Sequence, residues 1–226
     1  MTGPVLASNA DSLLWWDWVE RHGDDIWLRT VEHLRLAGTA LAIGFAISIV
    51  LALIALRFRR TYGPITWVTG ILYTIPSLAL FAFLVPITGL GTVTALIGLV
   101  GYTLLILVRN IVAGVDGVPA AVKEAADGMG YTPWRRVVAV DLRLATPAIV
   151  AGLRIAAVTT IGLVTITALV GAGGYGVLID DGLRRRFNTP IVLGATLSVA
   201  MAVAFDLLLL GAERVLTPWA RRGRSL

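Results

Sequence analysis

The 226-residue chain contains no cysteine and only two histidines. Without cysteine the chain has no disulfide bond, no thiol that could act as a nucleophile and no cysteine-ligated metal site. His22 and His33 have no suitably spaced His or Glu partners, and the sequence offers no Ser-His-Asp set for hydrolysis. We therefore expect no metal site and no catalytic residue in this chain.

Charged residues are also scarce. They make up 15% of the chain, whereas hydrophobic residues make up 57% and the mean hydropathy is +0.84. An average soluble domain carries about 25% charged residues. The few charges separate long apolar runs, and about 20 apolar residues suffice for a helix to cross the hydrocarbon core. The composition therefore predicts an all-α, multi-pass protein of the cell membrane.

Five runs are long enough to span. Residues 61–108 carry no charge and are too many for one helix, and the Pro86–Gly91 stretch divides them in two. The expected spans cover residues 36–56, 64–86, 90–108, 147–170 and 190–212. They form a transmembrane domain over 34–213, with tails over 1–33 and 214–226.

Basic residues predict the orientation, because they concentrate in cytoplasmic loops. With the N-terminus outside, the cytoplasmic side holds twelve: Arg57, Arg59, Arg60, Arg109, Lys123, Arg135, Arg136, Arg143, Arg214, Arg221, Arg222 and Arg224. The outside then holds six: Arg21, Arg29, Arg35, Arg184, Arg185 and Arg186. The expected topology is N-out and C-in, which puts the loop over residues 116–143 in the cytoplasm.

The net charge of +5 reflects these loop arginines rather than nucleic-acid binding, since no basic patch is interleaved with aromatic residues. The N-terminus has no basic segment followed by an apolar core, so no cleavable signal peptide is expected. Four tryptophans precede the first span: Trp15, Trp16, Trp18 and Trp27. Indole rings settle at the headgroup level, which predicts an amphipathic interfacial helix, with partner binding as the alternative.

The loop between the third and fourth spans is built from two short helices. An acidic residue and a proline, Asp116 and Pro119, precede an alanine-rich stretch that ends at Gly130. Thr132 and Pro133 then begin a second helix that runs towards Leu142. A loop this compact is typical of a docking element rather than a tether.

This loop resembles the EAA loop of ABC-importer permeases, in which EAA, a glycine and an Ile-x-Leu-Pro follow at fixed spacing. Glu124, Ala125, Ala126, Gly130 and Leu142 match the pattern, and Val140 stands for the isoleucine. Arg143 replaces the expected proline. The resemblance implies a prokaryotic type I ABC-importer permease core, with Glu124, Ala125, Ala126, Gly130, Tyr131, Val140 and Leu142 coupling it to an ATPase.

Further stretches resemble the osmoprotectant branch of these permeases, which imports glycine betaine, carnitine or choline. They are Tyr73–Leu80, Pro147–Arg154 and Gly171–Gly176. The resemblance implies as partners a second permease subunit, two ATPase subunits and an extracytoplasmic binding protein, in addition to membrane lipids. It implies no cofactor in this chain, and no Walker sequence for ATP is present. The alternatives are a permease for an amino acid such as methionine and, further off, an autonomous channel or secondary transporter.

Gly171–Gly176 also satisfies the G-x-G-x-x-G spacing of dinucleotide sites, which require a strand before the glycines. Here a membrane helix precedes them, so Gly173 and Gly174 are interpreted as a flexible or unwound exit that lines the translocation pathway or packs against protein.

Two ionisable residues lie within spans, Arg154 and Asp206. A charge in a membrane is costly unless it is paired or hydrated, so these two are hypothesised to pair. Separate snorkelling and interface roles remain the alternative. Aromatic rings could contact a quaternary ammonium by cation–π attraction, which makes Tyr73 the first expected pathway residue, followed by Tyr102 and Tyr175.

Overall fold

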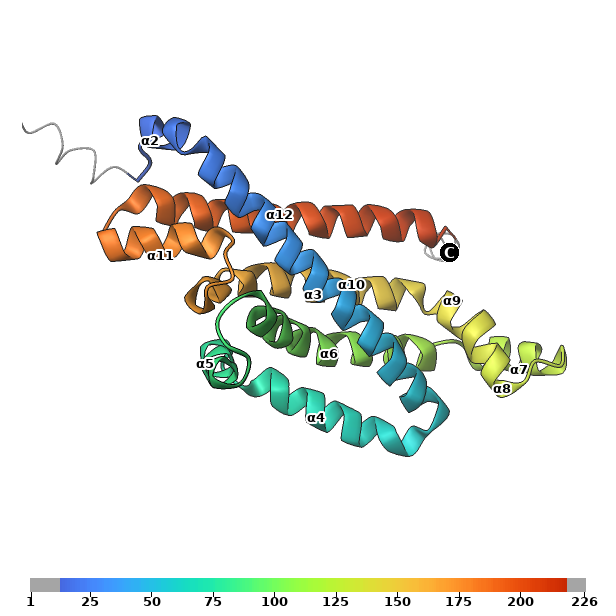
Figure 1. Cartoon of the computed structure of the whole chain (residues 1–226). Helices are drawn as coiled ribbons and strands as arrows, with labels where there is room; N and C mark the ends of the chain where they lie inside the picture. The colour runs from blue at the N-terminus through green and yellow to red at the C-terminus, as the bar shows by residue number, and fades with distance from the viewer. Residues whose placement is uncertain (1–12, 219–226) are drawn as a thin grey trace, which may run out of the picture. The chain divides into compact units, whose positions relative to one another are not determined.

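The computed structural model describes residues 13–218, and these form helices and turns with no strand (Figure 1). The long helices are α3 (Gly23–Arg57), α6 (Thr92–Asp116), α10 (Thr146–Val164) and α12 (Asn188–Leu216). The shorter elements are α2 (Trp16–Arg21), η1 (Arg59–Thr61), α4 (Tyr62–Thr74), α5 (Ser77–Thr88), α7 (Ala120–Gly128), α8 (Pro133–Arg136), η2 (Val137–Asp141), α9 (Leu142–Leu144), η3 (Ile166–Val170) and α11 (Tyr175–Arg185).

Each of the four long helices is long and apolar enough to cross a membrane. Helices α4 and α5 form a bent pair, which raises the number of candidate spans to five if the pair counts as one. The described chain is therefore the all-helical, multi-span protein that its composition predicts.

The second predicted span, over residues 64–86, is not one straight helix. Helix α4 ends at Thr74, α5 begins at Ser77, and the two are bent by 98°. Pro76 has no N–H to donate to the preceding turn and disfavours helical geometry at Ile75, and its own ψ of 132° is extended. The chain between residues 61 and 91 is thus either a broken span or a re-entrant segment.

The first long helix begins earlier than expected. Helix α3 starts at Gly23, so residues 23–33, assigned from the sequence to an outer tail, continue directly into the first span. Asp24 and Asp25 lie in its first turn, where carboxylates favour a helix start. Asp25 also forms an i,i+4 ion pair of 3.1 Å with Arg29.

The four tryptophans between residues 15 and 27, in or beside α2 and at the start of α3, do not share one environment. Trp16 and Trp27 are about two-thirds exposed, as an interfacial role requires. Trp15 and Trp18 instead pack edge-on against the ring of Phe187, at centroid distances of 6.2 and 5.7 Å. Only part of the tryptophan-rich segment is therefore available to the headgroup region.

Helix α11 has no counterpart among the helices expected from the sequence. Two i,i+4 ion pairs, Arg184–Asp180 at 2.8 Å and Arg185–Asp181 at 2.7 Å, stabilise it. Figure 1 shows it running beside the first turns of α12. The contact is close at Gly182, where a Cβ would lie 2.6 Å from Cγ1 of Ile191.

The described chain divides into two compact units, and helices α3, α6, α10 and α12 contribute residues to both. The first unit comprises residues 13–40, Ile75–Leu99 and Thr159–Ala204. The second comprises Leu41–Thr74, Val100–Val158 and residues 205–218. The second unit has an apolar core of five buried residues: Ala52, Ala55, Val108, Ile111 and Val112.

Small residues bring the helices of the second unit close together. A Cβ at Gly114 would lie 2.9 Å from Cβ of Ala148, and one at Gly152 would overlap the side chain of Asn110. Helices α6 and α10 can therefore approach closely, as small residues permit in membrane bundles. This packing supports the loop that connects the two helices.

Candidate functional site

The loop between α6 and α10 is folded, and polar contacts hold its first residues in place. Asp116, the last residue of α6, forms an ion pair with Arg59, with Nη1 to Oδ2 at 2.9 Å. These hydrogen bonds raise the pKa of the Arg59 guanidinium above its ordinary value. Lys123 donates from Nζ to the backbone carbonyl of Asp116 at 3.4 Å. The start of the loop is thereby tied to η1 and to the first turn of α7.

Helix α7 ends in a glycine corner. Gly130 has a φ of +83°, the left-handed conformation that its sequence context predicts. Its N–H donates to the carbonyl of Asp127 at 2.9 Å, and the N–H of Tyr131 donates to that of Ala126 at 3.2 Å. These two bonds constitute a Schellman motif, which satisfies the last carbonyls of the helix and reverses the chain.

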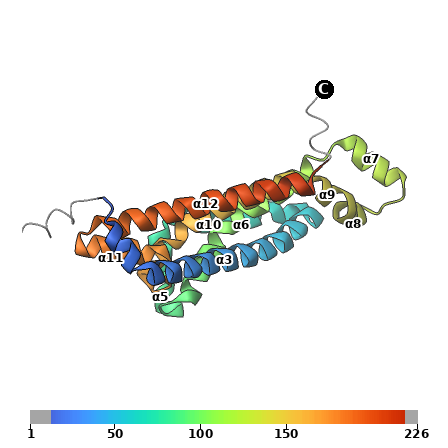
Figure 2. The same ribbon diagram turned by 90° about the horizontal axis from the view of Figure 1, so that it is seen from above.

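The second helix of the loop runs through Leu142, as the sequence predicts, but it contains a π-helical stretch. Thr132 caps α8, its hydroxyl accepting from the N–H of Arg135 at 3.4 Å, and Pro133 occupies the first turn. A π-helical stretch, η2, then covers Val137–Asp141 before α9. Figure 2 shows α7 beside α8 at this end of the second unit.

The π-helical stretch buries a carboxylate that sequence reasoning did not identify. The side chain of Asp141 is 2% exposed, and its Oδ2 lies 3.5 Å from Nε of Arg136. Arg136 also pairs with Asp127 at the end of α7. Arg136 thus links α7 to the second helix. Asp127 lies nine residues before it and Asp141 five residues after it, a spacing that matches no recognisable sequence motif.

The exposed surface of α7 is built from small side chains. Ala121, Glu124, Ala125 and Gly128 are exposed and share one helical face, whereas Ala126 is buried. Met129 follows them and is 70% exposed. Of the expected coupling residues, Glu124 and Ala125 therefore face outward, and Ala126 anchors the helix.

The other expected coupling residues hold the loop in shape. Gly130 forms the corner, and the ring of Tyr131 lies under the guanidinium of Arg135 at 4.9 Å. Val140 and Leu142 are half-buried, and Leu142 packs against the apolar core of the second unit. The arrangement presents a flat, small-residue face with one carboxylate on a rigid support, which suits docking of another protein.

Arg154 and Asp206, the two ionisable residues within predicted spans, contact each other between α10 and α12. Nε of Arg154 donates to Oδ1 of Asp206 and Nη2 to Oδ2, both at 2.8 Å. Glu213, about two turns further along α12, lies 3.8 Å from Nη1 of Arg154. Glu213 lies just beyond the predicted span over residues 190–212, so the sequence did not single it out as an intramembrane charge.

Tyr73 and Tyr102 also lie together. Their ring centroids are 6.0 Å apart and the rings are inclined by 69°, an edge-to-face arrangement between α4 and α6. Tyr102 is buried, whereas Tyr73 is 39% exposed. Of the two, only the Tyr73 ring is open to a small molecule in this chain.

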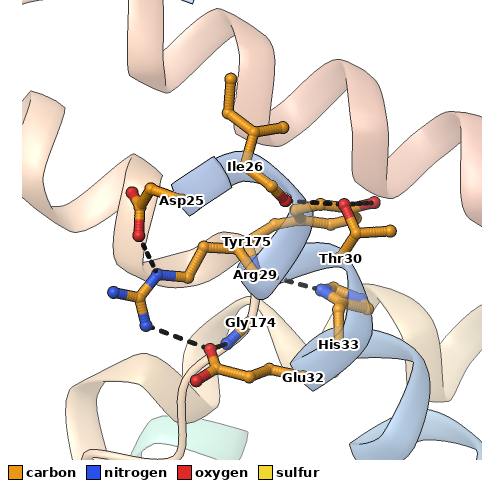
Figure 3. A network of polar contacts seen from close by, with 8 residues as sticks. All are labelled: Asp25, Ile26, Arg29, Thr30, Glu32, His33, Gly174 and Tyr175. Atoms are coloured by element: carbon orange, nitrogen blue, oxygen red, sulfur yellow. Dashed lines mark hydrogen bonds and ion pairs between the residues drawn. The ribbon is translucent and has the colours of Figure 1, made fainter. Parts of the chain in front are cut away.

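The glycine-rich stretch packs against protein, one of the two settings expected of Gly173 and Gly174, and Tyr175 lies there with it. Figure 3 shows Gly174 and Tyr175 bound to α3 by a polar network in the first unit. Oε2 of Glu32 accepts the N–H of Gly174 at 2.9 Å, and the hydroxyl of Tyr175 bonds that of Thr30 at 3.1 Å. The Tyr175 ring is 2% exposed, so it packs helices together rather than lining an open surface of this chain.

His33 stands at the centre of this network and is fully buried. Its Nδ1 accepts the N–H of Tyr175 at 3.3 Å, and its Nε2 lies 3.0 Å from the carbonyl of Ile161. Since Nδ1 must accept, Nε2 carries the proton and donates. Gly171, Gly173 and Gly174 all have positive φ, so the six-residue glycine-rich stretch is an ordered turn between η3 and α11, without the strand that a dinucleotide site requires.

Within residues 13–218, no three His, Asp or Glu side chains converge on a point that could hold a metal ion. The features of the chain that stand out chemically are therefore the loop between α6 and α10, the Arg154 ion pairs and the Tyr73–Tyr102 pair.

Residues 29–222 match the family described as binding-protein-dependent transport system inner membrane component. The chain is 34% identical to the choline transport system permease protein OpuBB of Bacillus subtilis, over 88% of this chain and 92% of that protein. It is 32% identical to the glycine betaine/carnitine/choline transport system permease protein OpuCB of the same species, over 91% and 94%. It is 34% identical to the osmoprotectant import permease protein OsmW of Salmonella typhimurium, over 84% and 90%.

Among solved structures, the fold is similar to a chain of the methionine ABC transporter MetNI in an inward-facing conformation. The TM-score is 0.76 over 85% of this chain and 96% of that chain, at 23% identity. At this identity the similarity establishes the fold and says nothing of the substrate.

Proposed function

The chain belongs to the family of binding-protein-dependent transport system inner membrane components, and we propose that its substrate is an osmoprotectant with a quaternary ammonium group, such as glycine betaine, choline or carnitine. Members of this family are non-catalytic, multi-pass permeases of the bacterial inner membrane. They carry no cofactor, and ATP is bound by a partner ATPase. The chain is thus one component of an importer that also contains an ATPase, a binding protein and a permease partner.

The substrate proposal is supported chiefly by the near full-length similarity to permeases named for choline, carnitine and glycine betaine. Their names differ in the particular compound, but all three compounds carry a quaternary ammonium group. Such a group cannot donate a hydrogen bond, so a permease contacts it through aromatic faces or carboxylates. The half-exposed ring of Tyr73 fits that requirement.

The coupling proposal follows from the loop between α6 and α10. In an N-out, C-in orientation this loop lies in the cytoplasm, where the ATPase is. The exposed face of α7, with Glu124 as its carboxylate, would enter a recess of the ATPase, and the Gly130 corner with the Arg136 ion pairs would transmit the movement to α10. Closing and opening of two ATPases would then rock two permease copies between inward- and outward-facing states.

Uptake measurements test the substrate. Cells that carry the complete system, and cells in which this chain alone is deleted, are given labelled glycine betaine, choline, carnitine and methionine. We expect uptake of at least one quaternary ammonium compound that depends on this chain. Methionine uptake without uptake of any of the three others would overturn the osmoprotectant proposal and leave the family membership intact.

A further inference from the structure

A cleft of about 420 Å³ opens between the end of α3, the end of α6 and the loop that contains α7 and α8. This size is within the range of small-molecule sites. Four of its lining side chains are basic, Arg57, Arg59, Lys123 and Arg136, and one is acidic, Asp141. All of these residues belong to the second unit. Neither the family nor the coupling loop as described accounts for a basic cleft at this position.

Two of the four basic groups are not neutralised by a carboxylate. Arg59 pairs with Asp116, and Arg136 pairs with Asp127 and Asp141. Lys123 contacts only the backbone carbonyl of Asp116. Within residues 13–218, Arg57 has a cation–π contact with Phe58 and no carboxylate partner. The cleft therefore offers two positive charges and the remaining donors of two arginines to an anion.

The rest of the lining is apolar. Leu56 and Val115, close to the last residues of α3 and α6, form part of the wall, together with Val137. Trp134 also lines the cleft and is 43% exposed. Basic groups beside apolar side chains at the end of membrane-spanning helices, with a tryptophan nearby, match the depth at which phospholipid headgroups lie.

We propose that this cleft binds the phosphate of an anionic phospholipid headgroup, with Arg57 and Lys123 as its principal charge partners. A guanidinium matches phosphate with two parallel hydrogen bonds, and the apolar wall accommodates the glycerol and upper acyl carbons. The bound lipid contacts the end of α3 and both helices of the loop at once. Its occupancy therefore stabilises the loop in the orientation that the structure shows. This inference rests on the proposed function in one respect, the cytoplasmic placement of the loop.

A binding measurement on the full-length chain tests the proposal without any transport assay. The purified chain in a non-ionic detergent is titrated with short-chain phosphatidylglycerol, with phosphatidylcholine of the same chain length, and with inorganic phosphate, and the unfolding temperature is recorded. We expect phosphatidylglycerol to raise it more than the other two do. The increment should shrink as salt is added, because the contact is partly exposed.

Arg57→Gln and, separately, Lys123→Gln should each weaken the apparent affinity for phosphatidylglycerol roughly fivefold, the usual contribution of one basic residue near a lipid surface. Arg60→Gln is the matched control, since Arg60 lies in η1 beside the cleft but does not line it. It should bind phosphatidylglycerol as the unmodified chain does.

Four results would overturn the proposal. Equal stabilisation by phosphatidylglycerol and phosphatidylcholine would remove the selectivity for an anionic headgroup. Equal losses of phosphatidylglycerol affinity in Arg57→Gln and Arg60→Gln would show that only the general surface charge attracts the lipid. Stabilisation by inorganic phosphate that matches phosphatidylglycerol and is lost in Arg57→Gln would assign the cleft to a soluble phosphate compound. Unchanged lipid binding with lost ATPase binding in Arg57→Gln would assign it to an acidic segment of the ATPase instead. None of these results bears on the substrate, which the uptake measurements address.

Discussion

Arg154 of α10 and Asp206 of α12 form two parallel hydrogen bonds of 2.8 Å. Glu213 adds a contact of 3.8 Å to the same guanidinium, so one arginine faces two carboxylates. Removal of Arg154 would leave both carboxylates without this cation, whereas removal of Asp206 would leave Arg154 with Glu213. Loss of Arg154 should therefore destabilise the folded chain more than loss of Asp206 does.

Arg154→Gln is expected to lower the unfolding temperature in detergent more than Asp206→Asn does. The double variant should be more stable than Arg154→Gln alone, because an uncompensated charge costs more than a neutral pair. A double-mutant cycle should give a favourable coupling energy between the two residues. Strictly additive losses would show that the two residues stabilise the chain independently.

Gly130→Val should insert and fold but fail to couple. A β-branched side chain at a φ of +83° is strained, on the order of 1–3 kcal/mol, and would redirect α8 relative to α7. Co-purification with the ATPase and substrate-stimulated ATP hydrolysis measure the effect. Gly63→Val is the control, because Gly63 has helical geometry and open space around it. Wild-type transport by Gly130→Val would disprove the corner as a coupling element.

Glu124→Ala should leave the stability of the permease unchanged and weaken its binding to the ATPase roughly tenfold or more. Glu124 is exposed and forms no ion pair within residues 13–218, so its removal costs the isolated chain little. A charge that becomes buried in a complex contributes far more to binding than to folding. Affinity measurements on the purified subunits test this, with Glu20→Ala, exposed in α2, as the control.

Tyr73→Ala should raise the substrate concentration needed for half-maximal uptake about two- to fivefold, the contribution of one exposed cation–π contact. Tyr73→Phe should preserve uptake, because the attraction depends on the ring face and not on the hydroxyl. Trp67→Ala, an exposed ring on the same helix, is the matched control. If Tyr73→Ala and Trp67→Ala behave alike, the Tyr73 ring has only a packing role.

Sequence reasoning succeeded where one residue type has few alternatives. Gly130 predicted a left-handed corner because other residues are strained there, and Thr132 with Pro133 predicted a helix start because the cap and the missing N–H both suit that position. Arg154 and Asp206 could be paired because isolated charges within spans are costly. In each case a local physical cost determines the structure.

It failed where several local solutions cost nearly the same. Pro76 predicts an irregularity, but a proline in a membrane helix is compatible with anything from a slight kink to the 98° bend that separates α4 from α5. The π-helical turn that buries Asp141 depends on the ion pairs of Arg136, which join residues from both loop helices. Helix α11 carried a readable signal in the i,i+4 spacing of Asp180 and Asp181 to Arg184 and Arg185. From the sequence, these arginines were counted only as basic residues on the outer side.

The two hydrogen bonds of His33 have an evolutionary consequence. One ring nitrogen serves the N–H of Tyr175 and the other the carbonyl of Ile161, so the position needs a donor and an acceptor on separate atoms. Of the uncharged side chains, only Asn and Gln share that property with neutral imidazole. A homologous chain with an apolar residue here must satisfy both backbone groups by other means. Substitutions at position 33 should therefore occur together with changes in residues 171–176, a pattern of co-variation that an alignment of permease sequences would reveal.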